Sequence, residues 1–160
     1  MMARKLSEGG FTLVELITIM ILIGILAVVA LPNLNVAEGF GATSFRDRIA
    51  ASLRYAQKSA VAKRRLVCAT VAADRVTLTA DAGFGANACA NALAGPDGAT
   101  PAALSPSAAI TVAAVPAGPL YFQPSGAVTS DAAGTAPTDY SLTVAGQTPI
   151  TVNGATGYVD

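Results

Sequence analysis

The feature that most constrains this chain is an apolar run of 21 residues near its start, from Phe11 to Leu31. A helix of this length, at about 1.5 Å per residue, matches the hydrocarbon core of a bilayer, which is about 30 Å thick. We therefore expect a transmembrane helix over residues 11–31. Arg4 and Lys5 precede it, and the next basic residue is Arg46. The positive-inside rule then predicts a cytoplasmic N-terminus and an exported remainder.

A single acidic residue, Glu15, interrupts this run. A carboxylate within a membrane helix costs about 2.5–3.5 kcal/mol on insertion scales, and such residues usually mark a specific partner. The alternative is an ordinary secretory signal peptide cleaved near residues 28–30. A disposable signal has no use for a carboxylate, which argues against that alternative. In an isolated chain, Glu15 can instead reach the lipid headgroups near the helix start.

The segment GGFTLVE, residues 9–15, resembles the prepilin cleavage and methylation motif of type IV pilins and type II secretion pseudopilins. The resemblance implies a leader peptide over residues 1–10, which a prepilin peptidase removes by cutting between Gly10 and Phe11. It also implies N-methylation of Phe11 and a filament-core helix over residues 11–31. The implied location is the bacterial inner membrane, with the head in the periplasm, and afterwards a pilus or a pseudopilus.

Cleavage would create an ammonium group on Phe11, and a buried carboxylate needs a cation. Glu15 of one subunit is therefore expected to neutralise the Phe11 amine of its neighbour during assembly. The partners implied are the prepilin peptidase, other pilin or pseudopilin subunits, and the inner membrane before assembly.

A kink followed by an amphipathic helix is predicted over residues 32–67. Pro32 removes a backbone donor and biases the preceding residue away from helix, so a kink or a melted stretch is expected there. In similar pilins a proline at this place helps subunits to pack; the alternative is an ordinary break where the chain leaves the membrane. At about 100° per residue, one stripe collects the apolar residues Phe45, Ile49, Leu53, Ala56, Ala60 and Val67.

Residues 68–160 are predicted to form a β-sheet head. A hairpin is expected over residues 66–80, with its turn at 73–75, and a long variable surface loop over residues 81–108. Further strands are expected at residues 110–115, 120–122, 140–144, 149–152 and 156–159, with a turn at 123–126. The predicted fold class is α+β, with a long N-terminal helix packed on a small antiparallel sheet.

Later segments resemble one branch of the same family. ASLRYAQKSAVAKRRLVCATV and LYFQPSGAV are similar to the helix-to-strand region and the Phe-x-Pro-x-Gly hairpin of GspH/FimT-type pilins, and PITVNGATGYVD is similar to MshC-like minor pilins of mannose-sensitive haemagglutinin (MSHA) systems. This implies the type IV pilin fold and a structural or initiating minor subunit of an MSHA-like pilus. The alternatives are a GspH-type minor pseudopilin of type II secretion, a FimT-like, DNA-binding minor pilin and a subunit with an adhesive role at the filament tip.

Charge is unevenly distributed along the head. From Val76 onward the chain has five aspartates and no Lys or Arg, whereas the segment before it is basic. Lys63, Arg64 and Arg65 are the only local candidate for a phosphate contact. Because phosphate binding generally needs several cations on one accessible surface, nucleic acid is not an expected partner.

The chain has two cysteines, Cys68 and Cys89, and no histidine. An even cysteine count in an exported chain predicts a disulfide, which in the chain-entropy model stabilises by about 3 kcal/mol. The absence of histidine excludes Ser-His and Cys-His nucleophiles, and no carboxylates cluster at motif spacing. We therefore expect neither an enzyme nor a cofactor or metal site.

Overall fold

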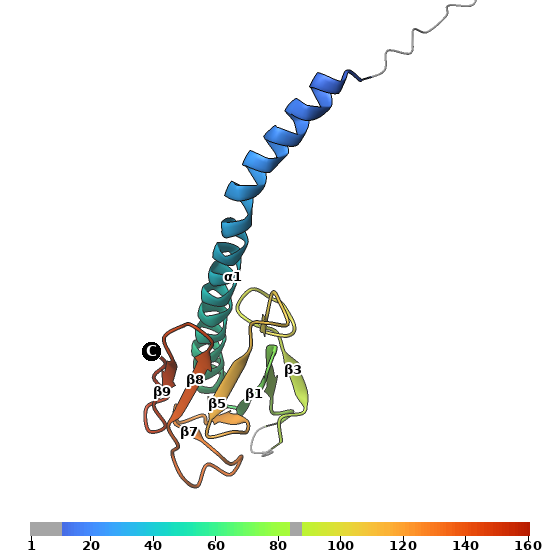
Figure 1. Cartoon of the computed structure of the whole chain (residues 1–160). Helices are drawn as coiled ribbons and strands as arrows, with labels where there is room; N and C mark the ends of the chain where they lie inside the picture. The colour runs from blue at the N-terminus through green and yellow to red at the C-terminus, as the bar shows by residue number, and fades with distance from the viewer. Residues whose placement is uncertain (1–10, 84–87) are drawn as a thin grey trace, which may run out of the picture. The chain divides into compact units, whose positions relative to one another are not determined.

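The computed structural model describes residues 11–83 and 88–160, apart from the side chains of residues 28–38. It divides into two compact units, residues 1–37 and 38–160, which are described separately. One helix and nine strands occupy the described residues (Figure 1): α1 (Leu13–Lys63), β1 (Val67–Ala72), β2 (Arg75–Ala80), β3 (Asn91–Leu93), β4 (Ala103–Leu104), β5 (Val112–Val115), β6 (Leu120–Phe122), β7 (Val128–Thr129), β8 (Tyr140–Val144) and β9 (Ile150–Val152).

The N-terminal unit contains the first part of α1. The helix assignment continues through residues 32–41, where we expected a kink or a melted stretch. The melted stretch is therefore not observed, because a proline removes one helical hydrogen bond while the neighbouring turns can keep theirs; the kink stays a prediction. Among the described residues, no helix combines the length and the apolarity needed to cross a membrane, so the span expected over residues 11–31 is not confirmed.

Within the head, α1 is amphipathic as predicted. Five of the six residues in the predicted stripe lie on α1 and are at most 1% exposed: Phe45, Ile49, Leu53, Ala56 and Ala60. The sixth, Val67, is also buried, but it belongs to β1 because α1 ends at Lys63. The predicted end of the helix at residue 67 was therefore wrong.

The helix ends at Lys63 in a Schellman motif built on an unusual residue. The Arg65 N–H donates to the Ala60 carbonyl at 3.1 Å, and the Arg64 N–H donates to the Val61 carbonyl at 3.3 Å. Arg64 adopts the left-handed conformation, with φ 52°. Glycine is the usual residue at this position, so the sequence carried no signal for the helix end.

The larger sheet has the order β3-β2-β1-β6-β7, with β4 also paired to β2. The predicted hairpin is confirmed, since β1 and β2 pair from Val67↔Ala80 to Ala72↔Arg75. The predicted variable loop over residues 81–108 was wrong in part. It contains β3 and β4, which pair with the two ends of β2, and it buries Ala102 and Ala103 in the core. Two strands this short show no alternation that a sequence pattern can detect.

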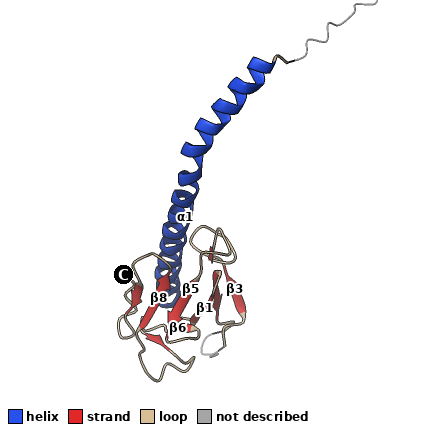
Figure 2. Ribbon diagram, in the orientation of Figure 1, coloured by secondary structure: helices blue, strands red, loops and turns tan. Residues whose placement is uncertain are grey.

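The second sheet has the order β5-β8-β9 (Figure 1). Figure 2 labels β5 and β8 of this sheet in the same orientation. The predicted strand over residues 140–144 matches β8. The strand expected over residues 156–159 is only an isolated bridge between Val152 and Val159. Gly157 explains this difference, because it has φ 67° and a Cβ there would collide with the Gly126 carbonyl and the Gln57 side chain. The last segment is thus a tight turn against α1 and the hairpin after β6.

One hydrophobic core joins α1 to both sheets. Its largest fully buried side chains are Phe45, Phe122, Ile49, Leu53, Leu78, Leu120, Leu142, Ile150, Val67, Val76, Val128 and Val144. The predicted α+β class, with the helix packed on antiparallel sheet, is confirmed; the sheet is divided in two.

Candidate assembly site

The first part of α1 exposes apolar side chains on all its sides. Exposure ranges from 41% at Ile19 to 75% at Phe11, across Phe11, Leu13, Val14, Leu16, Ile17, Ile19, Met20, Ile21, Leu22, Ile23, Ile25 and Leu26. A helix that is apolar all round is normally buried, and large exposed apolar surfaces mark contacts with proteins or membranes. This segment therefore needs a partner that the isolated chain does not provide.

Glu15 is the only charged residue between Phe11 and Ala27, and its side chain is exposed. It lies in the first turn of α1, where the helix dipole stabilises a carboxylate by about 0.3–1 kcal/mol. The Glu15 N–H donates to Thr12 Oγ1 at 3.2 Å, so Thr12 is the N-cap of the helix. The Thr-x-x-Glu spacing, typical of a capping box, is the sequence signal for this cap, which was not among the predicted features.

The other polar side chain near Glu15 is satisfied within the helix itself. The Thr18 hydroxyl lies 3.0 Å from the Val14 carbonyl and 2.8 Å from the Glu15 carbonyl, and it can donate to either. The Glu15 carboxylate is therefore the group in this segment that is available to an outside cation.

Of the other predicted assembly residues, the structure describes only Phe11 in full. Phe11 precedes the helix and is exposed, whereas Gly10 lies outside the described residues, as does the side chain of Pro32. Cleavage after Gly10, methylation of Phe11 and a packing role for Pro32 all stay predictions.

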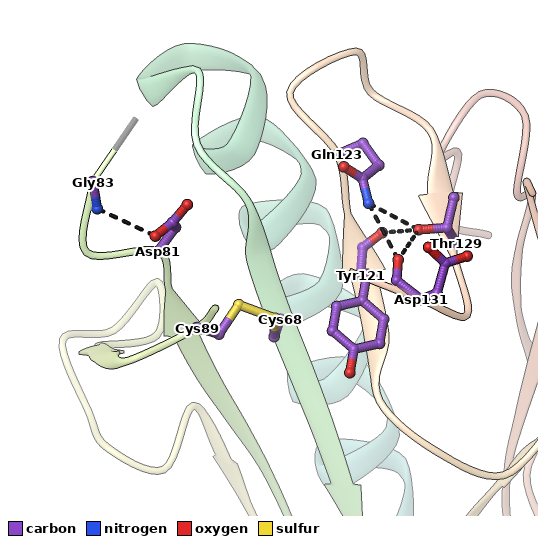
Figure 3. The surroundings of a disulfide bond; sticks show 8 residues. All are labelled: Cys68, Asp81, Gly83, Cys89, Tyr121, Gln123, Thr129 and Asp131. Carbon is purple, nitrogen blue, oxygen red and sulfur yellow. Dashed lines mark hydrogen bonds between the residues drawn. A yellow bond between two sulfur atoms is a disulfide. The ribbon is translucent and has the colours of Figure 1, made fainter. Parts of the chain in front are cut away.

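The predicted disulfide is present in the head (Figure 3). Cys68 on β1 is bonded to Cys89, 21 residues later, with the two Cα atoms 6.1 Å apart. The bond ties the segment between β2 and β3 to the middle of the larger sheet. Within the described residues, no group of three or more potential metal ligands occurs, and neither cysteine is free.

Three arginines on α1 attach the helix to loops of the head. Arg46 Nε donates to the Thr148 carbonyl and Arg54 Nε to the Val159 carbonyl, each at 3.1 Å. Arg48 pairs with Asp97 at 3.0 Å. The Ala99 N–H, which donates to Asp97, and secondarily Arg48 lower the pKa of that carboxyl. These arginines therefore act mainly inside the head.

The predicted basic cluster, Lys63, Arg64 and Arg65, lies together at the end of α1 and is exposed. No carboxylate lies within 4.0 Å of it among the described residues. Cations at a helix C-terminus also complement the helix dipole, which gives the cluster a role without any ligand.

Comparison with known proteins gives one informative similarity. The chain matches no known protein-family profile and no curated protein sequence. Its structure is similar to the crystal structure of the type IV minor pilin FimU from Pseudomonas aeruginosa strain PAO1, with a TM-score of 0.54 over 77% of this chain and 89% of FimU. This chain has a type IV pilin-like fold. Sequence identity to FimU is 17%, so the similarity concerns the fold alone.

The predicted type IV pilin fold is thereby confirmed. The finer assignment to MSHA-like, GspH-type or FimT-like proteins stays a prediction, because a fold is shared by subunits with different roles.

Proposed function

We propose that this chain is a minor subunit of an MSHA-like type IV pilus, assembled through its N-terminal helix. The observation that carries the proposal is the start of the chain from Phe11 to Ala27, where the large apolar side chains are exposed and the only charged residue is Glu15. Packing side by side with other such helices would cover this surface. The head, which has its own core, would then lie outside the helical bundle.

In this proposal, a prepilin peptidase cuts between Gly10 and Phe11 and methylates the new amine. The subunit waits in the inner membrane with its head in the periplasm. On assembly, the Phe11 ammonium of one subunit and Glu15 of its neighbour leave water together. An unpaired buried charge is destabilising by about 3–5 kcal/mol, so docking is favoured only in the register that pairs the two groups. The same chemistry would serve a type II secretion pseudopilus, and neighbouring genes distinguish the two systems.

Glu15→Ala tests the pairing directly. We expect normal synthesis, membrane insertion and cleavage, but strongly reduced incorporation into filaments, because the partner of the neighbouring ammonium is lost. Glu15→Gln, which keeps hydrogen bonding without charge, should be similarly or slightly less impaired. The measurement compares the protein in sheared filaments with that in membranes, in a strain that also makes the wild-type partners.

Thr12→Ala is the matched control, since it removes the helix cap and keeps the carboxylate. If Glu15 served only to cap its own helix, Thr12→Ala would impair incorporation as much as Glu15→Ala does. Normal incorporation of cleaved Glu15→Ala would contradict the pairing mechanism. Intact-mass analysis checks the processing: a mature chain beginning at methylated Phe11 is expected, and a start near Leu31 would establish signal-peptidase cleavage instead.

A further inference from the structure

A shallow pocket of about 360 Å³ lies on the outer face of the β5-β8-β9 sheet. The inner face of this sheet carries the buried residues Tyr140, Leu142, Val144, Ile150 and Val152. Because side chains alternate along a strand, the residues between them face outward. The pocket is lined on this outer side by Val115, Asp139, Ser141, Thr151, Asn153 and Tyr158.

Strand pairing arranges these side chains in two adjacent rows. Tyr140 pairs with Val152, which forms a bridge to Val159, so Asp139, Asn153 and Tyr158 lie next to one another in the neighbouring row. The Asn153 N–H donates to the Tyr158 carbonyl at 2.9 Å, which fixes this row.

The second row is formed by the next outward-facing residue on each strand, which is two residues along the chain from the first row. Ser141 pairs with Thr151 on one side and with Val115 on the other, and Asp160 donates its N–H to the Thr151 carbonyl at 2.9 Å. Three distant segments of the sequence thus build one surface.

The polar groups of the pocket are held in place and still have capacity to bind. Asp139 Oδ1 accepts from the Gly154 N–H at 2.7 Å, which leaves Oδ2 available. Asn153 Oδ1 accepts from the Thr156 N–H at 3.0 Å and from its hydroxyl at 2.9 Å, which leaves the Asn153 amide donors available. The pocket also presents the hydroxyl groups of Ser141, Thr151 and Tyr158.

Two apolar groups border the same pocket. Tyr158 is 65% exposed and Val115 is 69% exposed, which makes both of them exposed apolar groups of the head. An exposed aromatic ring beside fixed donors and acceptors fits a ligand with one apolar face and several hydroxyl groups.

We propose that this pocket binds a neutral hexopyranose unit of a carbohydrate. The C–H face of the sugar ring would stack on Tyr158, Asp139 would accept hydrogen bonds from two neighbouring hydroxyls, and Asn153 would donate to their oxygens. The lining residues include no cation, and no ion pair among the described residues involves Asp139, so an acidic sugar is disfavoured by repulsion. An added peptide strand does not fit, because residues 158–160 already occupy the outer edge of β9. The proposal is independent of the assembly function.

Saturation-transfer NMR tests the proposal on the full-length protein in micelles of a detergent without a sugar head group. The probes are the methyl glycosides of glucose, galactose, mannose and N-acetylglucosamine, with methyl glucuronide as the acidic comparison. We expect saturation transfer to at least one neutral glycoside and weaker binding of the glucuronide.

Variants locate the binding. Tyr158→Ala should weaken the affinity about tenfold, which corresponds to about 1.4 kcal/mol for the lost stacking. Tyr158→Phe keeps the ring and should retain most of the affinity, whereas Asp139→Asn should weaken it by removing the accepting oxygen. Thr143→Ala is the matched control, because Thr143 lies on β8 and is exposed but does not line the pocket; its affinity should be that of the wild type.

No transfer to any neutral glycoside would overturn the proposal, as would unchanged affinity in Tyr158→Ala or equal binding of the glucuronide. Tyr158 and Asp139 are both exposed, so these variants should keep the wild-type Tm. If Tyr158→Ala lowers the Tm, Tyr158→Phe and Asp139→Asn decide the question, and unchanged affinity in Asp139→Asn overturns the proposal.

Discussion

Tyr140 places a phenolic hydroxyl in the core of the head, where the residue is only 3% exposed. The hydroxyl donates to the Pro119 carbonyl at 3.2 Å. Burial raises the pKa of Tyr140, and the nearby Tyr121 and Asp131 add to this effect. Ionisation would remove the donated proton and leave a charge in apolar surroundings, so the folded state favours the neutral phenol.

The pH dependence of stability should therefore have a contribution from Tyr140. Because its folded pKa lies above the ordinary value of 10.0, this contribution is fully present below about pH 10 and is lost as the pH rises through the folded pKa. Tyr140→Phe should cost about 1 kcal/mol at neutral pH, through the lost hydrogen bond, and should flatten the alkaline decline. Calorimetric Tm values across this pH range check the result, with Tyr158→Phe as the exposed control. Equal alkaline slopes in Tyr140→Phe and the wild type would contradict the prediction.

Arg64 occupies a backbone conformation that favours glycine, with φ 52°. The left-handed conformation costs a residue with a side chain about 1–2 kcal/mol, and glycine avoids this cost. The greater conformational freedom of glycine in the unfolded chain offsets part of the stability gained by the replacement. Arg64→Gly should therefore stabilise the head by about 0.5–1 kcal/mol in urea unfolding. Lys63→Gly, one residue earlier and still in α1, should instead destabilise by about 1 kcal/mol. Destabilisation by both changes would show that the Arg64 side chain has a contact more valuable than the relieved strain.

The strands that could be predicted from the sequence are those in which buried and exposed residues alternate. β6 and β8 match their predicted ranges, because inward residues such as Leu142 alternate with outward residues such as Ser141. β3, β4 and β7 are no longer than β6 but lack its alternation of buried and partly exposed residues, so they exist through pairing with neighbours, which no local pattern records.

Among the site residues, too, those that a local sequence pattern marks could be predicted, and those brought together by strand pairing could not. The Cys68–Cys89 bond followed from counting cysteines, and the cap at Thr12 was readable from its spacing to Glu15. The row formed by Asp139, Asn153 and Tyr158 was not readable, because it depends on the register of β8 and β9 and on the turn that follows them.

The disulfide should stabilise the element that it attaches to the larger sheet. Replacing both cysteines by alanine, which avoids burying a hydroxyl at the 4% exposed Cys68, should cost about 3 kcal/mol in the free energy of unfolding. Urea unfolding gives this value. A reducing agent should lower the stability of the wild type by a similar amount and leave the double variant unchanged. A wild-type protein whose stability does not respond to complete reduction would contradict the prediction.

The buried core and the exposed apolar surface of the first part of α1 lie in different parts of the chain. Among the described side chains, those of the hydrophobic core lie at or after Ala42, whereas the large apolar side chains from Phe11 to Leu26 are exposed. The first unit therefore offers surface to partners, and the second unit contains the contacts that determine its own fold.

This division predicts that residues 38–160 fold without the preceding segment. Among the side chains that the structure describes, none in residues 1–37 belongs to the core, so the fragment should unfold cooperatively and sediment as a monomer without detergent, whereas the full chain should need detergent or self-associate. Circular dichroism on heating and sedimentation velocity make the two measurements. A fragment that starts at residue 48 is the control: it lacks Ala42 and Phe45, and the loss of a core phenylalanine alone costs about 3–5 kcal/mol, a large part of the stability of a small domain. If the 38–160 fragment also fails to unfold cooperatively, the first part of α1 must contribute to the stability of the head, and the separation of folding from assembly would be wrong.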